Sequence, residues 1–303
     1  DAGFPHDVVQ YLPGLGEEVG RALVEHPDVG LIMFTGSKAV GLSILQAAST
    51  VRTGQRHIKH AVAEMGGKNA VIVDEDADLD AAIKGILASC FSYQGQKCSA
   101  CSRLIVHEAV YDRLLERLTG AVDGLLIGDP VSPSCDLGPV IDRDAVQRLA
   151  GAIAHGTQSA TLLYRYPEAR LPKEGYFVGP ALFAGVAPTD RLAQEELFGP
   201  VVCTFRVRTF EEALTLANDV DYGLTGGVYS RSPSHLERAI EHFDVGNLYL
   251  NRPITGALVG RQPFGGHKLS GLGTKAGGPD YLSQLLIPKT VCENTTRHGM
   301  PLE

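Results

Sequence analysis

The apolar run Val29-Gly30-Leu31-Ile32-Met33-Phe34, followed at once by Thr35-Gly36-Ser37, decides the fold class of this chain. An uninterrupted apolar run of this kind is typical of a parallel strand that is buried on both faces. Residues 38–50 have the pattern of a helix, and Ala61-Val62-Ala63-Glu64 has that of a short strand. A strand, a crossover helix and a second strand in this order predict a parallel α/β unit.

The residues before this unit extend the same alternation towards the start of the chain. Val8-Val9-Gln10-Tyr11-Leu12 is an apolar run ended by Pro13-Gly14, which predicts another strand. Residues 17–26 predict a helix, because acidic side chains come early and apolar residues follow on one side. Strand, helix, strand, helix and strand within the first 64 residues predict a doubly wound sheet.

A second α/β unit begins at Asn69-Ala70-Val71-Ile72-Val73, another apolar strand pattern. Asp78 stands where it can cap a helix over residues 79–91, since Asp is a favoured N-cap residue. Glycines are dense between residues 251 and 279, and we expect loops there. Further strands are expected at 103–106, 201–205, 226–229 and 247–250, and further helices at 109–124, 143–155, 210–218 and 234–243.

Composition and charge narrow the class of protein. The chain has 303 residues, of which 44% are hydrophobic and 20% charged, with a net charge of -8. The acidic balance argues against a nucleic-acid partner. No apolar run approaches the roughly 20 residues of a membrane-spanning helix, and the first residues lack the order of a signal peptide. We expect a cytoplasmic protein with a core large enough for about two domains.

Cysteine usage points to a reducing compartment, because six cysteines are few for this length and form no disulfide framework. Cys98-x-x-Cys101 is compatible with a redox pair or with half of a zinc site. A zinc site needs two more ligands at motif spacing, and the sequence has no second C-x-x-C or H-x-H pair. We therefore expect no metal. The six are Cys90, Cys98, Cys101, Cys135, Cys203 and Cys292.

The stretch Gly95-Gln96-Lys97-Cys98-Ser99-Ala100-Cys101 places a thiol among small and polar residues, directly after the apolar run 86–91. Such a thiol is a candidate nucleophile. The alternative is an ordinary buried cysteine, since free Cys is among the most buried residue types. The stretch alone favours the buried cysteine, so the choice depends on the other motifs.

Three further stretches combine polar groups with glycines at strand ends or turns. Phe34-Thr35-Gly36-Ser37 marks a strand-to-helix turn whose free N–H groups suit a phosphate, although Ser37 is equally suited to cap the helix. Glu64-Met65-Gly66-Gly67-Lys68 sets a carboxylate at a strand end, with a solvated Glu as the alternative. Glu195-Glu196-Leu197-Phe198-Gly199-Pro200 offers an acid for ribose hydroxyls and an aromatic for a flat ring, or else a turn.

Together these motifs resemble those of the aldehyde dehydrogenase superfamily, in the same order and spacing over nearly the whole chain. Five motifs in order are far more specific than any one of them, and they favour the functional interpretation of each. The match rests on Phe34-Thr35-Gly36-Ser37 with Val40-Gly41, Glu64-Met65-Gly66-Gly67-Lys68, Gly95-Gln96-Lys97-Cys98, Glu196-Leu197-Phe198-Gly199-Pro200, and Pro263-Phe264-Gly265-Gly266 with Ser270-Gly271.

Within the superfamily the chain looks like the branch that oxidises L-glutamate γ-semialdehyde, the 1-pyrroline-5-carboxylate dehydrogenases of proline catabolism. In many bacteria this dehydrogenase is the C-terminal part of a bifunctional protein with proline dehydrogenase, so the resemblance implies that domain as a partner. It also implies a homo-oligomer. The residues that carry this likeness are Gly95-Gln96-Lys97-Cys98-Ser99-Ala100, Asn251-Arg252-Pro253-Ile254-Thr255-Gly256-Ala257, Arg261-Gln262-Pro263-Phe264-Gly265-Gly266 and Lys275-Ala276-Gly277-Gly278-Pro279.

The resemblance implies that Cys98 attacks the aldehyde, that hydride passes to NAD, with NADP as an alternative, and that Glu64 activates the water that hydrolyses the thioester. For this chemistry we expect the pKa of Cys98 to fall below its ordinary value of about 8.5, and that of Glu64 to rise on partial burial. The implied cofactor-binding residues are Gly36, Ser37, Gly66, Glu196 and Phe198, and the implied substrate-binding residues are Ser99, Gly256, Ala257 and Phe264.

An aldehyde dehydrogenase-like α/β fold is implied as well. It would divide into a partial, Rossmann-like NAD-binding domain (1–66), an α/β catalytic domain (67–270) and a C-terminal tail (271–303) for oligomerisation.

The family has further residues before the point where this chain begins, including strands of the cofactor sheet, an oxyanion-hole Asn and an adenosine-binding Lys. Because the chain opens on Asp1-Ala2-Gly3-Phe4-Pro5-His6, without Met, we expect a fragment with an exposed sheet edge that binds NAD poorly on its own.

Three alternatives to this function stay open. One is a truncated, non-catalytic interaction module, against which the intact Cys98, Glu64 and Glu196 argue. The second is an acylating enzyme with coenzyme A in place of water. The acylating branch usually lacks the acid at the position of Glu64, so its presence argues against that reaction. The third is a dehydrogenase of another aldehyde.

Overall fold

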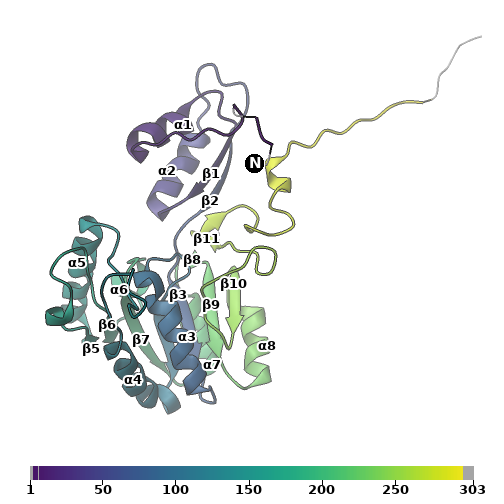
Figure 1. Cartoon of the computed structure of the whole chain (residues 1–303). Coiled ribbons are helices and arrows are strands. Elements are labelled where there is room, and N and C mark those ends of the chain that lie inside the picture. Colours follow the sequence, from purple (N-terminus) through teal and green to yellow (C-terminus); the bar gives the residue numbers. More distant parts are fainter. Residues whose placement is uncertain (1–2, 6, 296–303) are drawn as a thin grey trace, which may run out of the picture.

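The computed structural model describes residues 3–5 and 7–295, which form a small upper part and a larger lower part (Figure 1). The small part is built around a sheet of order β1-β2-β12. β1 (Leu31–Thr35) and β2 (His60–Glu64) are parallel, and β12 (Gly271–Leu272) pairs with β2 in the antiparallel direction. Segments from both ends of the sequence therefore share this sheet.

Helices of the small part follow the predicted order. A π-helical turn, Gly16–Gly20, runs into α1 (Arg21–Glu25), and α2 (Lys38–Ala48) crosses from β1 to β2. Ser37 is the N-cap of α2, and its hydroxyl accepts a hydrogen bond from the N–H of Val40 at 3.3 Å. The predicted helices at 17–26 and 38–50 and the strand β2 are thus confirmed.

The large part is a sheet of order β10-β9-β3-β4-β7-β6-β5, in which all neighbours are parallel except β6 and β5. A separate pair, β8 and β11, is antiparallel. The bounds are β3 (Asn69–Val73), β4 (Cys101–His107), β5 (Thr161–Arg165), β6 (Ala181–Ala184), β7 (Val201–Val207), β8 (Tyr222–Gly223), β9 (Thr225–Tyr229), β10 (Asn247–Leu250) and β11 (His267–Lys268).

Helices cover both faces of the large sheet, which gives this part a doubly wound α/β arrangement (Figure 1). Side chains alternate between the faces of a strand. Val71 and Val73 of β3 join the core formed with α3 (Leu79–Phe91) and α4 (Glu108–Asp123). The alternate residues of β3 join a second core, formed with α5 (Arg143–Ser159), α7 (Phe210–Asn218) and α8 (Pro233–His242); a short helix, α6 (Arg191–Gln194), precedes β7.

The start of α3 shows how locally some of this fold is encoded. Asp78 accepts hydrogen bonds from the N–H groups of Asp80 and Ala81 at 3.0 and 3.2 Å, as predicted for its N-cap. These bonds hold the pKa of Asp78 below its ordinary value, with the Ala81 N–H as the main cause. An N-cap of this kind typically contributes about 1 kcal/mol to helix stability.

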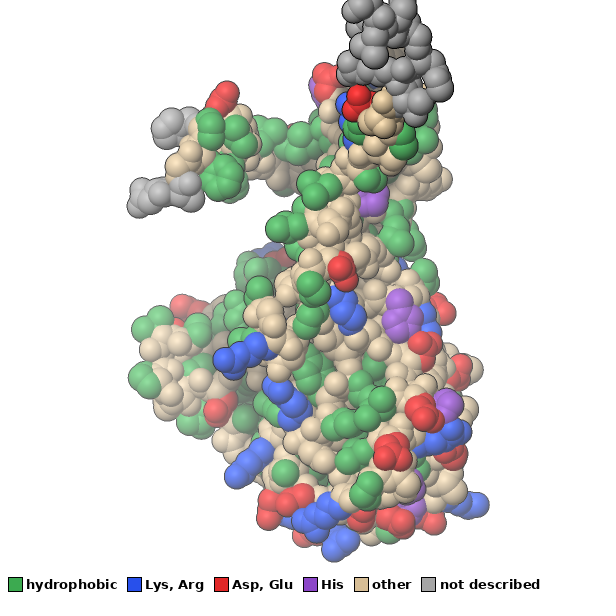
Figure 2. Space-filling model, turned by 90° about the vertical axis from the view of Figure 1, so that its right-hand side faces the viewer, with side chains coloured by type: hydrophobic (Ala, Val, Ile, Leu, Met, Phe, Trp, Pro, Cys, Tyr) green, Lys and Arg blue, Asp and Glu red, His purple; other side chains and the backbone are tan. Residues whose placement is uncertain are grey.

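The structure corrects two predictions for the small part. Leu31 and Met33 in β1 are 38% and 44% exposed, although the apolar run predicts burial on both faces. In the described residues β1 pairs with β2 alone, so its other edge has no neighbouring strand. Residues 8–12 form a turn and an irregular segment instead of the predicted strand, and their apolar side chains are exposed. Figure 2 shows hydrophobic side chains at the surface of this upper part.

The predicted loops between residues 251 and 279 carry the short strands β11 and β12, and the chain then makes a 3-10 turn, Ser283–Leu285. Beyond it the chain extends away from the body, with Leu286 and Ile287 exposed (Figure 1). Residues 296–303 of the predicted tail lie outside the described residues. In the described chain, no helix has the length and apolar character needed to cross a membrane.

Candidate active site

The candidate site lies where the two parts of the molecule join. β2 ends at Glu64, and after residues 65–68 the chain enters β3 at Asn69. Asn69 is opposite Cys101, the first residue of β4, so the loop that carries the candidate nucleophile lies beside the end of β2. The Glu196 loop precedes β7, which pairs with β4. The carboxyl end of the small sheet therefore faces the amino ends of three strands of the large sheet.

The nucleophile loop, residues 92–100, begins with a left-handed turn. Tyr93 and Gln94 both have φ of 59°, and Gly95 has φ of 69°, a region that favours glycine. A Cβ on Gly95 would stand 2.6 Å from the carbonyl oxygen of Gly199. Glycine is therefore required here both for the turn and for the close approach to the Glu196 loop.

Cys98 is half-buried, and its surroundings raise the pKa of its thiol above the ordinary value. Burial is the main cause, and the carboxylates of Glu196 and then Glu64 add to it. The N–H groups of Ser99 and of Cys98 itself act in the opposite direction. The prediction of a lowered pKa is therefore wrong for this arrangement, because two acids face the sulfur. A thiol of this kind needs a nearby base to take its proton.

Glu64 has the properties of a general base. Burial raises its pKa from 4.5 to about 7, and the charge of Lys275 partly opposes this shift. The predicted rise is confirmed. Its Oε2 atom is buried and accepts no hydrogen bond from the described residues. Its Oε1 atom lies over Gly265, 3.0 Å from where a Cβ would stand there. The carboxyl group is thus held by packing and remains available for proton transfer.

Glu196 lies against the glycines that follow β2. Its Oε1 atom accepts a hydrogen bond from the N–H of Gly67 at 3.1 Å, and a Cβ on Gly66 would stand only 1.8 Å from Oε2. Burial raises the pKa of Glu196. The Gly67 N–H and the charge of Lys68 act in the opposite direction and lower it. Phe198 follows with φ of 53°, an uncommon conformation for a bulky residue, and it is partly exposed. The structure therefore brings Glu64, Glu196 and Cys98 together.

In the turn after β1, the predicted phosphate-binding groups make hydrogen bonds within the protein. The N–H of Gly36 donates to the carbonyl oxygen of Glu64 at 3.0 Å, and the Ser37 hydroxyl caps α2. These contacts favour the capping alternative for Ser37 in this structure. The turn still lies at the carboxyl edge of the small sheet, because Thr35 pairs with Glu64.

Two of the predicted substrate residues lie near the site. Ser99 is buried, and its carbonyl oxygen accepts a hydrogen bond from the hydroxyl of Thr225 at 3.2 Å. Phe264 exchanges two backbone hydrogen bonds with Ala276, at 2.9 and 2.7 Å, beside Gly265 and the Glu64 carboxyl group. The Ser99 loop and the Phe264 loop therefore flank the site from different elements.

Gly256 and Ala257 belong to a more open loop. Gly256 has φ of 82° and is exposed. The loop is anchored two residues earlier, where the N–H of Ile254 donates to the Ser89 hydroxyl of α3 at 3.1 Å. No hydrogen bond among the described residues joins Gly256 or Ala257 to Ser99.

Sequence reasoning missed three polar residues of this site. Lys68 is fully buried, its Nζ has no hydrogen-bond partner in the described chain, and burial lowers its pKa to about 8. Lys275 donates to the carbonyl oxygen of Gly265 at 3.1 Å and faces Glu64. Asn69 is buried under the nucleophile loop. For Lys68 and Asn69 the signal was present: two polar residues open an otherwise apolar strand pattern.

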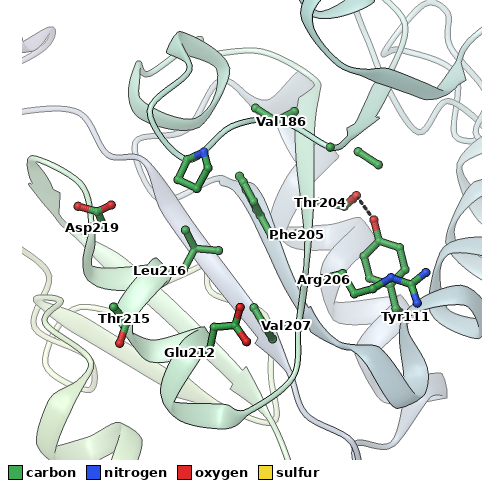
Figure 3. Close-up of a pocket in the computed structure, with 13 residues that line it drawn as sticks. Tyr111, Val186, Thr204, Phe205, Arg206, Val207, Glu212, Thr215, Leu216 and Asp219 are labelled. Carbon is green, nitrogen blue, oxygen red and sulfur yellow. Dashed lines mark hydrogen bonds between the residues drawn. The ribbon is translucent and has the colours of Figure 1, made fainter.

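A separate hollow of about 880 Å³ lies between α7 and the strands β6 and β7 (Figure 3). Apolar side chains such as Phe205 and Leu216 line it, and Tyr111 bonds to Thr204 at 2.8 Å on one side. None of its lining residues belongs to the candidate site. In the described part of the chain, no three His, Cys, Asp or Glu side chains are grouped as metal ligands, and all six cysteines are free thiols.

Comparison with known proteins identifies the class. The profile described as "Aldehyde dehydrogenase family" matches residues 1–291. The chain is 47% identical to a 1-pyrroline-5-carboxylate dehydrogenase of Bacillus pumilus over 292 residues, 96% of this chain and 56% of the relative. Proline utilization A from Bdellovibrio bacteriovorus has a TM-score of 0.94 and 49% identity, over 99% of this chain and 31% of that one. The chain belongs to the aldehyde dehydrogenase family.

A second solved structure gives the same fold. The 1-pyrroline-5-carboxylate dehydrogenase from Thermus with bound NAD has a TM-score of 0.89 and 51% identity, over 93% of this chain and 54% of that one. The resemblance inferred from the motifs, and the fold class, are confirmed. The chain spans about half the length of the curated relatives it matches.

Proposed function

We propose that this chain supplies the nucleophile and the base of an NAD-dependent dehydrogenase that oxidises L-glutamate γ-semialdehyde, formed from 1-pyrroline-5-carboxylate, to L-glutamate. The observation that carries the proposal is the grouping of Cys98 with the carboxylates of Glu64 and Glu196 at the junction of the two sheets. The similarity to 1-pyrroline-5-carboxylate dehydrogenases supports this substrate. The proposal concerns the whole protein of which this chain would form part.

The residues around Gly66 fit a dinucleotide cofactor. Glu196 lies over a glycine whose missing side chain leaves space, and its carboxylate can accept hydrogen bonds from ribose hydroxyls. Phe198 lies two residues further on with part of its ring exposed, where it can pack on a flat ring. Gly36 and Ser37, at the carboxyl edge of the small sheet, would face the pyrophosphate. Bound NAD would supply a hydride acceptor beside Cys98.

The steps on the protein side follow from the positions of the acids. Cys98 gives its proton to a base, and its sulfur forms a bond to the aldehyde carbon, which yields a thiohemiacetal. The N–H of Cys98 would donate a hydrogen bond to the new oxyanion. Loss of a hydride from this carbon leaves a thioester. Glu64 then takes a proton from water, whose oxygen attacks the thioester, and the Cys98 thiolate leaves as the carboxylic acid is released.

Glu64 suits this task because of its pKa. A general base works best when its pKa lies near the operating pH, and a carboxyl with a pKa of about 7 is half ionised in neutral solution. The rate of thioester hydrolysis should therefore rise with pH up to about 7 and level off above it. The presence of this acid argues for water, and against coenzyme A, as the final acceptor.

The substrate residues and partners belong to the same proposal. Ser99, Gly256 and Ala257 would bind the α-carboxylate of the substrate, with Phe264 against its aliphatic part. A proline dehydrogenase domain is proposed as a partner, in line with the likeness to proline utilization A. The chain would act in the cytoplasm as a homo-oligomer. Its three proposed domains are 1–66, 67–270 and 271–303, and the exposed Leu282 and Ile287 in the last of these would pack on a second subunit.

A trapping experiment tests the nucleophile and the base together. The whole protein with Glu64→Gln, supplied with NAD and glutamate semialdehyde, should keep an acyl group on Cys98, because thioester hydrolysis is blocked. Peptide mass spectrometry locates the acyl group, and absorbance records the NADH formed with it. Cys98→Ala is the matched control and should form neither. Steady NADH production by Cys98→Ala would sink the proposal.

A further inference from the structure

The buried side chain of Asn69 makes three hydrogen bonds. Two are to the nucleophile loop and one is to the first residue of β9. Its Nδ2 donates to the carbonyl oxygens of Cys98 and Ala100, at 2.7 and 2.8 Å. Its Oδ1 accepts from the backbone N–H of Thr225, at 3.0 Å. This pattern fixes the orientation of the amide, because the opposite orientation would place donor against donor and acceptor against acceptor.

A second donor supports the same loop from the start of the neighbouring strand, β9. The Thr225 hydroxyl donates to the carbonyl oxygen of Ser99 at 3.2 Å. The carbonyls of residues 98, 99 and 100 are thus all held from below by Asn69 and Thr225, the residues that open β3 and β9. Both side chains are almost fully buried, so no solvent replaces these bonds if a donor is removed.

The direction of the Cys98 carbonyl has a consequence on the other side of the peptide. The peptide between Cys98 and Ser99 is trans, so its C=O and N–H point in opposite directions. The carbonyl points to Asn69, and the Ser99 N–H points to the Cys98 sulfur, where it acts to lower the pKa of the thiol. A hydrogen bond to a carbonyl also strengthens the N–H of the same peptide as a donor.

We propose that Asn69 is a positioning residue for the nucleophile: by holding the Cys98 carbonyl, it aims the Ser99 N–H at the sulfur and stabilises the thiolate. The inference rests on the proposed function only in taking Cys98 as the nucleophile. Asn69 itself touches neither substrate nor cofactor in this assignment. It acts against the two carboxylates that disfavour the thiolate, Glu196 and Glu64.

Thr225 provides a matched control because it holds a peptide that does not face the sulfur. The Ser99 carbonyl belongs to the peptide whose N–H is that of Ala100, and this N–H donates to the carbonyl of Lys97 at 2.9 Å. Thr225→Val and Asn69→Ala therefore both remove a buried donor from the loop. Only Asn69→Ala frees the peptide that donates to Cys98.

The test is the pH profile of alkylation of Cys98 by iodoacetamide in the 303-residue chain, followed by peptide mass spectrometry. The exposed Cys292 in the same sample serves as the reference thiol. We expect Asn69→Ala to shift the midpoint of the Cys98 profile upwards by about one pH unit, and to slow alkylation at neutral pH about tenfold. Thr225→Val should shift it by less than about a third of that.

Several results would overturn the inference. One is an unchanged Cys98 midpoint in Asn69→Ala; another is an equal shift in Thr225→Val at a similar loss of thermal stability. If Asn69→Ala does not fold, Asn69→Leu, which fills the space without a donor, replaces it, and an unchanged midpoint there counts against the inference equally. Alkylation requires neither NAD nor aldehyde. A shifted midpoint, together with a whole protein whose Cys98 never acquires an acyl group from NAD and aldehyde, would reject the proposed function and leave the inference standing.

Discussion

The strands β1 and β3 have similar apolar sequences but different surroundings. Every residue of β3 is buried, because β9 and β4 flank it and helices cover both faces of its sheet. In β1 exposed and half-buried residues alternate, since within the described chain β2 is its one neighbouring strand. The difference teaches that an apolar run predicts a strand, whereas its burial depends on what packs against it.

The two parts also contribute different chemical groups. The small sheet ends in Glu64, which is buried by packing and whose Oε2 has no hydrogen-bond partner in the described residues. The large sheet carries the nucleophile loop, whose carbonyls are held by the buried residues Asn69 and Thr225. The base is thus positioned by packing, whereas the loop that carries the nucleophile is positioned by buried hydrogen bonds.

The largest expected effect compares the two strands directly. Ile72→Ala in β3 should lower the free energy of unfolding by about 2–5 kcal/mol, because it leaves a cavity in a closely packed core. Met33→Ala in β1 should lower it by less than about 1 kcal/mol, since the side chain is partly exposed already. Denaturant unfolding of both variants measures the difference. Equal losses of unfolding free energy would show that β1 is buried to the same extent as β3.

A smaller effect concerns the base. The pKa of Glu64 is raised in the folded chain, so the folded state holds its proton at pH values where the unfolded state has lost it. Stability therefore falls as pH rises from 4.5 to about 7, and Glu64→Gln should remove this loss. Above pH 7 we expect the variant to be more stable by about 1–3 kcal/mol, less than the full shift because solvent screens the group.

Thermal unfolding of wild type and Glu64→Gln across this pH range measures the effect. Below pH 4.5 the two curves should meet, because the carboxyl is then protonated in both states. Lys275→Met is a useful companion, since loss of the opposing charge should raise the pKa of Glu64 further and move the loss of stability to higher pH. A constant difference between wild type and Glu64→Gln at every pH would contradict the raised pKa.

The smallest expected effect separates two roles of Ser37. Ser37→Ala removes the N-cap of α2 and should lower thermal stability by the equivalent of about 0.5–1 kcal/mol. If Ser37 also contacts the cofactor, the affinity for NAD should fall by more than this loss explains. Asp78→Ala, which removes the cap of α3 in the large part, is the matched control and should leave NAD affinity unchanged. Calorimetric titration with NAD measures both variants.

Much of the site was predictable because its motifs are local. Glu64, Cys98 and Glu196 stand next to glycines that fix the chain direction within a few residues, and the structure brings all three together. The pKa of Cys98 was not predictable in the same way. Its neighbours come from segments far away in the sequence, and two of them are acids whose distance from the sulfur is set by how β2 meets the large sheet.

By itself, the sequence determined the order of strands and helices from residue 17 onwards, the cap at Asp78 and the set of reactive residues, because these depend on neighbours within one turn or one strand. Only the tertiary structure decided three further properties: the exposure of β1, the raised pKa of Cys98, and the bonds from Asn69 to the nucleophile loop. Burial, charge and hydrogen bonding act through space, so their outcome depends on which distant segments the fold brings into contact.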